Sequence, residues 1–438
     1  MRRLIVATFA VLCAAEVTAQ QKSSSDLSSA VETGITKVMP KVIAWRRDLH
    51  QHPELGNREV RTAKIIADHL RALGLEVRTE VARTGVVGVL KGGKPGPVVA
   101  LRADMDALPV TEMVDLPFKS TVRSTYAGQE VGVMHACGHD SHVAMLMGVA
   151  EVLAGMKQQI PGTVKFIFQP AEEGPPPGET GGAIDMIAQG VLENPKVDAV
   201  FGLHVMPYEN GAIGYKSGGL MASADVLHIT VRGRQTHGAV PWGGVDPIVV
   251  TSQIIQGLQT IVSRQIDLTT APAIVTIGRV SGGIRFNIIP DSVVLEGTIR
   301  ALDPQMQKDI HARIKRTAEK IAEAAGATAV VQIDTTYPVT FNDPNLTERM
   351  TPTLQRVTGN KLITVRPQTV AEDFSRYQQR VPGLFIFLGV NAPGADPAKV
   401  AANHSPYFFV DESALPVGVR ALSNLELDFL QQRVSTDR

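Results

Sequence analysis

The sequence alternates short apolar runs with helical segments, and this alternation limits the fold more than any other feature. Apolar runs bounded by Gly and Pro are typical of buried strands. They occupy residues 86–90, 98–101, 164–168, 197–203 and 384–388, with helical segments such as 145–156 between them. Strands that alternate with helices predict a mostly parallel sheet with helices on both faces. In such a sheet, functional sites collect at the C-terminal ends of the strands.

The pattern changes near Ala222, where apolar and polar residues begin to alternate as in a half-exposed strand. The segments that follow are a strand (225–233), a helix (247–264), two strands (273–278 and 292–300), a helix (304–325) and a strand (329–335). This β-α-β-β-α-β order is that of a ferredoxin-like unit. We therefore expect an α/β catalytic domain in two parts, 35–221 and 335–438, interrupted by a smaller domain at 222–334.

The length of the chain indicates two domains, and its balanced charge indicates a small substrate. A chain of 438 residues is too long for one ordinary hydrophobic core. Lys and Arg together number 43, and Asp and Glu also number 43, so the formal net charge is zero. Without a long basic run, nothing in the sequence indicates binding to nucleic acid.

The first residues are typical of a secretory signal peptide. Arg2 and Arg3 precede an apolar segment at 4–15, and small residues lead up to Ala19. The apolar segment is too short to span a bilayer as a helix. We therefore expect cleavage near Ala19, no stable membrane insertion afterwards, and a secreted or periplasmic protein. An uncleaved N-terminal anchor is the alternative.

Cleavage there would leave Cys137 as the only cysteine, which excludes an intramolecular disulfide. A single thiol in an oxidising compartment is exposed to oxidation unless it is buried or bound to something.

Two adjacent glutamates, Glu172 and Glu173, follow the apolar run at 164–168. Neighbouring residues of a strand point to opposite faces, so a continuing strand could not aim both carboxylates at one target. Pro170-Ala171 before the pair and the Gly and Pro residues after it break the strand and allow both to turn inward. One carboxylate could then bind a metal ion while the other transfers a proton.

A second cluster, at residues 135–142, contains three histidines, a cysteine and an aspartate. Cys137 and His139 are two residues apart, so in an extended segment both could face one metal ion, and thiolate and imidazole suit zinc and its neighbours. A redox or nucleophilic cysteine assisted by His139 is the alternative. A zinc finger is disfavoured because the chain has no second cysteine pair.

Two more histidines, His204 and His404, follow or lie near apolar strands. A single histidine is more often structural than a ligand, so neither indicates a site by itself. As a set with the residues above, they suffice for two metal ions that share one ligand. The candidate ligands are Cys137, His139, Glu173, His204 and His404.

The chain resembles the M20 metallopeptidase family, in its amidohydrolase branch of hippurate, N-acyl-amino-acid and indoleacetyl-amino-acid hydrolases. The matching segments are 46–54, 101–108, 134–140, 169–174, 202–204, 287–290 and 403–405. These segments follow one another in the same order as in the family. They span nearly all of the chain that would remain after cleavage of the signal peptide. Other branches have His at the position of Arg102 and a bridging Asp at that of Cys137, so this sequence follows the branch with the cysteine.

The resemblance implies a binuclear site held by the five candidate ligands, with zinc favoured over manganese, cobalt or nickel. A water activated by metal would be the nucleophile, and Glu172 the general base that passes the proton to the leaving amine. Asp104 and Asp106 would orient ligating imidazoles, although Asp106 could also be a solvated turn carboxylate. By the pattern of the family, His50 and His52 are structural residues or line the pocket.

The resemblance also assigns roles within the inserted domain. The residue that matches His237 reaches the site of a partner subunit in related dimers and polarises the scissile carbonyl. The match to Asn287 assists it, and the match to Arg300 binds the substrate carboxylate, for which a planar guanidinium is suited. We therefore expect the inserted domain to be a dimerisation or lid domain and the protein to be a homodimer or higher homo-oligomer. The alternatives are a turn residue for His237 and an edge-strand residue that opposes aggregation for Arg300.

The expected function is that of a metal-dependent amidohydrolase acting on a small molecule. It would cleave the amide bond of N-acyl or N-aroyl amino acids, including hippurate-like substrates and amide-linked toxins. A dipeptidase or carboxypeptidase of the same fold, or a catalytically silent binding protein, are the alternatives. The proline-rich segment 175–182 is longer than the turn usual in relatives and could reshape the rim of the pocket. The resemblance therefore does not identify the substrate.

Overall fold

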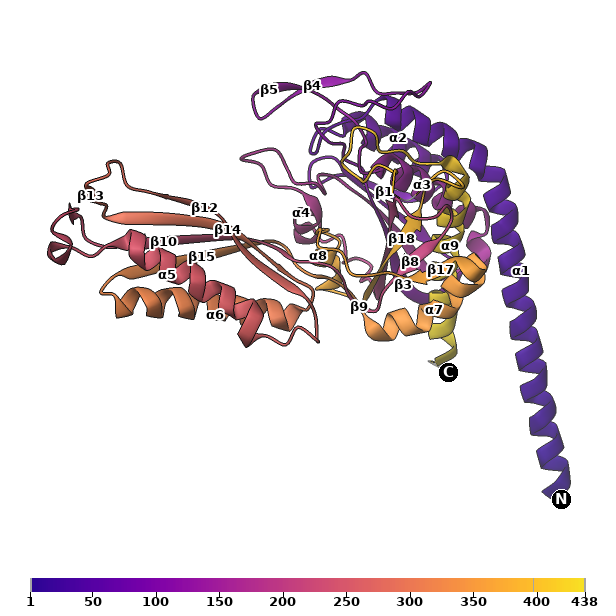
Figure 1. The fold of residues 1–438 in the computed structure, drawn as a ribbon. Coiled ribbons are helices and arrows are strands. Elements are labelled where there is room, and N and C mark those ends of the chain that lie inside the picture. Colours follow the sequence, from indigo (N-terminus) through magenta and orange to yellow (C-terminus); the bar gives the residue numbers. More distant parts are fainter. Residues whose placement is uncertain (1, 397, 437–438) are drawn as a thin grey trace. The chain divides into compact units, whose positions relative to one another are not determined.

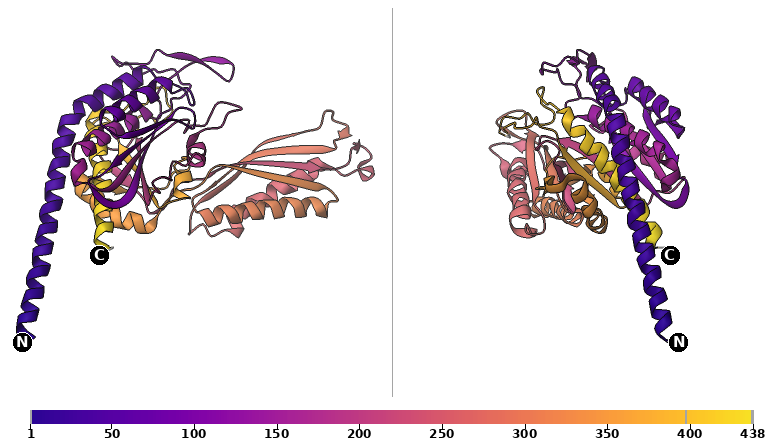
Figure 2. Two further views of the ribbon diagram at one scale, coloured as in Figure 1. Left: turned by 180° about the vertical axis from the view of Figure 1, so that it is seen from behind. Right: turned by 90° about the vertical axis from the view of Figure 1, so that its right-hand side faces the viewer.

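A computed structural model describes residues 2–396 and 398–436, with side chains described for 27–396 and 398–432. The chain forms two compact units, and each is described by itself (Figures 1 and 2). Unit 1 contains Met1–Tyr215, Glu348–Thr364 and Val381–Arg438. Unit 2 contains Lys216–Thr347 and Val365–Arg380.

Unit 1 is built around an eight-stranded sheet with the order β1-β2-β6-β3-β7-β18-β8-β17. The strands are β1 (Glu76–Val81), β2 (Gly85–Lys91), β3 (Lys94–Asp104), β6 (Pro161–Gln169), β7 (Ala199–Met206), β8 (Ile213–Tyr215), β17 (Leu362–Thr364) and β18 (Gly383–Gly389). The four central strands, β6, β3, β7 and β18, are parallel. Strands β1 and β2 add to the sheet in antiparallel fashion. The predicted mostly parallel sheet is confirmed.

Helices flank this sheet. They are α1 (Arg2–Gln51), α2 (Val60–Ala72), α3 (His139–Gly155), α4 (Gly182–Ala188), α7 (Pro344–Thr358) and α9 (Leu415–Thr436). Helices α1, α3 and α9 contact one another, and α3 and α9 also contact β3. Helix α3 is buried along almost its whole length. Its first four residues, 139–142, are polar, and the residues from Val143 to Leu153 are small or apolar apart from Glu151. Strands β4 (Arg123–Tyr126) and β5 (Gln129–Gly132) form a separate hairpin.

The predicted signal peptide, residues 1–19, falls where side chains lie outside the described residues, and it stays a prediction. Among the residues that are described, no helix combines the length and apolar character needed to cross a membrane.

Unit 2 contains a four-stranded antiparallel sheet with the order β12-β14-β10-β15. Its elements are β10 (Ala224–Arg232), α5 (Pro247–Thr260), β12 (Ala273–Gly282), β14 (Ser292–Ala301), α6 (Pro304–Ala324) and β15 (Thr328–Tyr337). This is the predicted ferredoxin-like order. Both helices begin with an Asp-Pro pair, in which Asp246 and Asp303 accept backbone N–H groups of the first turn. Buried apolar residues of α5 and α6 pack against the sheet.

Unit 2 also includes five short elements. Two of them, β11 (Thr236–His237) and β13 (Ile288–Ile289), lie within the range 222–334 expected for the inserted domain. The other three, β9 (Gly218–Met221), β16 (Thr340–Asn342) and α8 (Ser375–Gln378), lie beyond that range. The expected role of this unit in dimerisation or as a lid stays a prediction.

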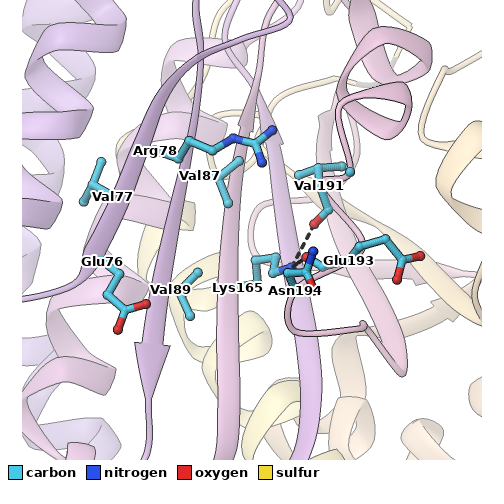
Figure 3. A pocket seen from close by; sticks show the side chains of 10 residues that line it. Glu76, Val77, Arg78, Val87, Val89, Lys165, Val191, Glu193 and Asn194 are labelled. Carbon is cyan, nitrogen blue, oxygen red and sulfur yellow. Dashed lines mark hydrogen bonds between the residues drawn. The ribbon is translucent and has the colours of Figure 1, made fainter.

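A buried lysine on β6 secures one of the loops beside the sheet. Lys165 is buried, and its Nζ donates to the carbonyl oxygens of Val191 at 3.0 Å, Glu193 at 2.8 Å and Pro195 at 2.9 Å. It lines a small cavity together with residues of β1 and β2 (Figure 3). One ammonium group therefore satisfies three backbone acceptors that would otherwise lie in a poorly solvated position.

Replacing this lysine should destabilise unit 1. Lys165→Met keeps the length of the side chain but leaves the three carbonyls without their donor, so we expect the free energy of unfolding to fall by about 2–4 kcal/mol. Denaturant-induced unfolding measures this change. Lys91→Met, on the neighbouring strand, removes a lysine whose side chain is 62% exposed and should change it by less than about 1 kcal/mol. Equal effects of the two substitutions on the free energy of unfolding would contradict the role of Lys165 as the donor to these three carbonyls.

Candidate metal centre

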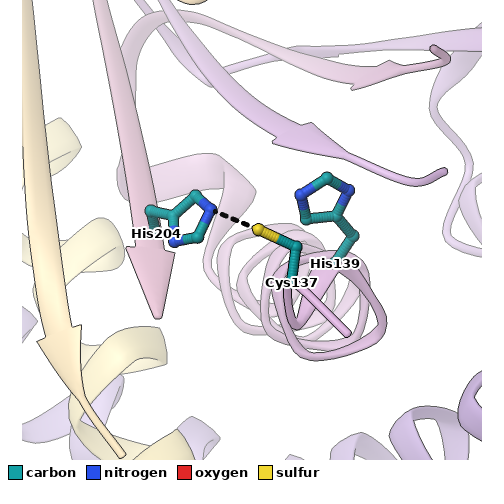
Figure 4. A group of neighbouring side chains, drawn as sticks. All are labelled: Cys137, His139 and His204. Carbon is teal, nitrogen blue, oxygen red and sulfur yellow. Dashed lines mark hydrogen bonds between the residues drawn. The ribbon is translucent and has the colours of Figure 1, made fainter. Parts of the chain in front are cut away.

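The five candidate ligands all lie in unit 1, near the C-terminal ends of its parallel strands. Glu173 follows β6, His204 lies in the last part of β7, and His404 is in the loop after β18. Cys137 and His139 lie where the chain enters α3 (Figure 4). This edge is where the alternation of strands and helices predicts a site.

The segment from Cys137 to His139 is not extended, as the sequence analysis supposed, but turns sharply into α3. Gly138 has φ +92°, in the left-handed region that favours glycine, and His139 is the first residue of the helix. A Cβ atom at residue 138 would lie 2.3 Å from Val205 Cγ2. The turn, rather than strand alternation, brings the thiol and the imidazole to the same side.

The donor atoms form two groups that share the Cys137 sulfur. In one group, atoms of Cys137, His139 and His204 lie within 4.8 Å of one another, and in the other those of Cys137, Glu173 and His404 do. Sγ of Cys137 is 3.3 Å from Nε2 of His204, as Figure 4 shows. Nε2 of His404 is 2.9 Å from Oε1 of Glu173. A shared sulfur between two sets of donors is the arrangement expected for two neighbouring metal ions.

The hydrogen bonding of two imidazoles fits this use. Nδ1 of His204 lies 2.7 Å from the carbonyl oxygen of Val205, which can only accept, so the lone pair is on Nε2 and faces Cys137. His139 is buried, and its Nε2 has no hydrogen-bond partner among the described residues. A buried nitrogen without a partner is unfavourable, and a cation bound there would remove the penalty.

The electrostatics around the thiol also favour a bound cation. Burial raises the pKa of the Cys137 thiol well above its usual range, and the Glu173 and Glu172 carboxylates raise it further. These groups can be ionised together only when positive charge lies among them. The donor set therefore fits divalent metal ions, and its thiolate and imidazoles suit transition metals of the zinc type.

Asp106 supports two of the candidate ligands at once. Its Oδ1 is 3.2 Å from Nδ1 of His139, and its Oδ2 accepts the backbone N–H of Glu173 at 3.0 Å. The carboxylate thereby orients the imidazole and fixes the chain beside it. Asp106 is buried, so it is not a solvated turn residue.

Asp104 makes its close contacts with residues that the sequence analysis did not assign to the site. It accepts from Nδ1 of His142 at 2.5 Å and from Nη1 of Arg102 at 2.5 Å, whereas Nε2 of His139 is 3.8 Å away. His142 in turn accepts the backbone N–H of Val205 at 2.8 Å. This chain of contacts holds the end of β7 against α3. The spacing of His142 one helical turn after His139 was the available signal for it.

The loop that carries His404 is attached to the same region. The backbone N–H of His404 donates to the carbonyl of Ala136 at 2.8 Å, and Nδ2 of Asn403 lies 3.2 Å from the carbonyls of Cys137 and Val205. These bonds place His404 beside Cys137 although 266 positions separate Asn403 from Cys137.

His50 lies between Asp140 and Glu112 at 2.9 and 3.1 Å and is buried, so it is structural.

The glutamate pair follows a backbone reversal. Ala171 has φ +49° and Gly174 has φ +99°, so the chain does not continue as a strand through residues 172 and 173. Oε2 of Glu172 and Oε1 of Glu173 both lie 4.0 Å from Nε2 of His139. The reversal allows two adjacent carboxylates to face one imidazole, as the break in the strand pattern predicted.

The other three predicted residues lie in unit 2. His237 on β11 pairs with Ile288, and the carbonyl of Asn287 accepts the N–H of Gly238 at 2.8 Å, so His237 and Asn287 are neighbours. Nδ1 of His237 accepts the N–H of Ala239 at 3.0 Å, which leaves the proton on Nε2. Arg300 lies on β14, which has β12 and β10 on its two sides. The alternative that Arg300 guards a sheet edge is therefore wrong.

Paired groups of metal donors at the carboxyl edge of a parallel sheet are typical of a metal-dependent hydrolase. Comparison with known proteins agrees and is more specific. Residues 100–427 match the family described as peptidase family M20/M25/M40, and the chain belongs to this family.

Relatives and solved structures cover nearly all of the chain. Thermostable carboxypeptidase 2 of Saccharolobus solfataricus is 40% identical over 407 residues, which is 92% of this chain and 99% of that protein. N-acetylcysteine deacetylase of Bacillus subtilis is 38% identical over 393 residues, 89% of this chain and 97% of the other. The crystal structure of the Bacillus subtilis YXEP protein, a dinuclear metal-binding peptidase of the M20 family, matches with a TM-score of 0.75 and 36% identity over 90% of this chain and 99% of that chain.

A bound metal ion should protect the Cys137 thiol from alkylation. We expect iodoacetamide to modify Cys137 at least about tenfold more slowly in the zinc-loaded protein than after chelation, because a coordinated thiolate is a poor nucleophile. Mass spectrometry of the peptide that contains Cys137 measures the rate. Magnesium, which prefers oxygen ligands, should give no protection. The comparison is made at a pH at which iodoacetamide does modify the chelated protein, and equal rates with zinc and with chelator at that pH would contradict ligation by this sulfur.

Proposed function

We propose that this protein hydrolyses the amide bond of N-acyl and N-aroyl amino acids to a carboxylic acid and a free amino acid. Hippurate-like compounds, other aromatic amides and amide-linked toxins of that shape are the substrates we infer. The observation that carries the proposal is the pair of donor groups that share Cys137, with the Glu172 carboxylate beside them. N-acetylcysteine deacetylase, a relative over nearly the whole chain, acts on an N-acyl amino acid by its name.

The five donors Cys137, His139, Glu173, His204 and His404 would hold two divalent ions, with zinc favoured over manganese, cobalt or nickel. When bound, such ions polarise a carbonyl group and lower the pKa of water. Glu172 is not part of the two groups that contain Cys137, and it forms a third group of neighbouring donors with His139 and Glu173. We assign it the transfer of a proton from the attacking water to the leaving amine. Glu173, whose carboxylate lies against His404, cannot serve this purpose while it is a ligand.

Residues of unit 2 complete the proposal. His237 keeps a proton on Nε2 and is exposed, so it can donate to the oxygen of a scissile carbonyl, with Asn287 assisting. Arg300 would bind the substrate carboxylate. We propose that His237 acts on the site of a second subunit in a homodimer. Three strongly exposed apolar side chains near this histidine support an interface: Trp242 at 81%, Ile284 at 95% and Phe286 at 95%.

A carboxypeptidase or dipeptidase is the second candidate, because thermostable carboxypeptidase 2 is among the relatives. A catalytically silent binding protein would be expected to lack donors, and all five are in place. We also propose that the protein is secreted or periplasmic, on the basis of the basic start and the apolar segment before Ala19.

Substrate class and the role of Glu172 can be tested together. We expect kcat/KM for N-acetyl and N-benzoyl amino acids to exceed that for dipeptides at least about tenfold. Glu172→Gln should keep the full metal content and lower kcat by a factor of about 10² to 10⁴, because an amide cannot accept the proton. Dipeptides as the better substrates would favour the peptidase, and normal turnover by the variant would remove the proposed base.

Subunit mixing tests the role of His237. Glu172→Gln and His237→Ala should each be inactive alone, yet a mixture should recover about a quarter of wild-type activity, because half the dimers are mixed and each holds one intact site. Steady-state hydrolysis after confirmed subunit exchange measures the recovery. No recovery under those conditions would place His237 in its own subunit's site or outside catalysis.

A further inference from the structure

The turn before the glutamate pair has a backbone conformation that needs support. Ala171 has φ +49°, in the left-handed region that residues other than glycine rarely adopt. Such residues persist where the surrounding structure holds them in place. Because Ala171 directly precedes Glu172, whatever holds it also sets the direction of both carboxylates.

Glu59 is the side chain that contacts this residue. It lies just before α2 and is 0% exposed. Its Oε1 accepts the backbone N–H of Ala171 at 2.9 Å, and its Oε2 accepts the hydroxyl of Thr84 at 2.6 Å. Two donors from separate segments therefore fix both carboxyl oxygens. Burial, with the nearby negative charge of Asp106, raises the pKa of Glu59 to about 7.

Residues next to Glu59 hold the segment that follows the glutamate pair. Asn57 Nδ2 donates to Glu179 Oε2 at 2.9 Å and to the carbonyl of Thr180 at 3.0 Å. Arg58 Nη2 lies 2.5 Å from Glu179 Oε1. The proline-rich segment 175–182 is thereby attached to residues 57 and 58. A Cβ atom at Gly56 would lie 3.2 Å from the Cα of Ala171, so the two chains are in close contact.

We propose that Glu59 is a positioning residue for amide hydrolysis, which holds the left-handed turn at Ala171 and so directs Glu172 and Glu173 to the same side. The role rests on the function proposed above for that pair. Glu59 acts through the Ala171 amide and need not touch the substrate. A polar residue that only filled the core would leave the turn and the turnover number unchanged when replaced by any residue that preserves the fold.

Three variants separate these two roles. Glu59→Ala removes the acceptor of the Ala171 amide, so kcat should fall about 10- to 100-fold with KM within about twofold. Glu59→Gln keeps a carbonyl oxygen for Ala171, and its amide can donate to the Thr84 hydroxyl, so it should restore most of kcat. Leu70→Ala, a fully buried residue of α2, should lower the melting temperature and leave kcat unchanged.

A second readout does not depend on activity or on bound metal. In the chelated proteins, hydrogen exchange at the Ala171 amide should be faster in Glu59→Ala than in wild type, and close to wild type in Glu59→Gln and Leu70→Ala. Unchanged exchange and kcat in a folded Glu59→Ala protein would overturn the proposal, as would equal losses of kcat in Leu70→Ala. If wild type hydrolyses no N-acyl amino acid, the proposed function fails, while the exchange result still decides whether Glu59 holds the turn.

Discussion

The Cys137 sulfur is the atom on which the site depends, because it is common to both groups of donors. A buried thiolate surrounded by carboxylates is stable only with positive charge among them. The neighbouring residues serve this requirement: Asp106 orients His139, and the backbone carbonyl of Val205 fixes the tautomer of His204. The fold supplies the place, since parallel strands end at one edge and bring together residues from 137 to 404.

The directions of the two glutamates depend on one local feature of the backbone. Left-handed Ala171 ends the strand geometry, so adjacent carboxylates no longer point to opposite faces. Asp106 then accepts the backbone N–H of Glu173, and His404 lies against its carboxylate. Glu172 lies near His139 but outside the two groups built on Cys137. The proposed ligand and the proposed proton carrier therefore lie side by side in one turn. For this reason the proposed support of that turn by Glu59 would affect both carboxylates.

Much of this could be predicted from the sequence, and the remainder depends on contacts between distant segments. Apolar runs predicted the central strands closely, for example 384–388 within Gly383–Gly389. The short strands β8 and β17 lack such a signal because each has only three residues. The candidate ligands stood out by residue type and family pattern. His142 and Glu59 were not assigned to the site, because their partners are distant in the sequence. His142 contacts Asp104 and the backbone amide of Val205, and Glu59 contacts Thr84 and the backbone amide of Ala171. Arg300 lies on an inner strand of its sheet because of the order of the strands. The local pattern of apolar and polar residues does not reveal that order.

The metal-to-chain ratio of the protein tests the central claim most directly. If Cys137 is the ligand shared by two ions, elemental analysis of zinc-loaded protein, after removal of loosely bound metal, should give two ions per chain. Loading should proceed to this ratio without a stable stage at one, because each ion stabilises the thiolate that the other needs. A limit of one ion per chain would contradict the shared sulfur and with it the division of roles between Glu172 and Glu173.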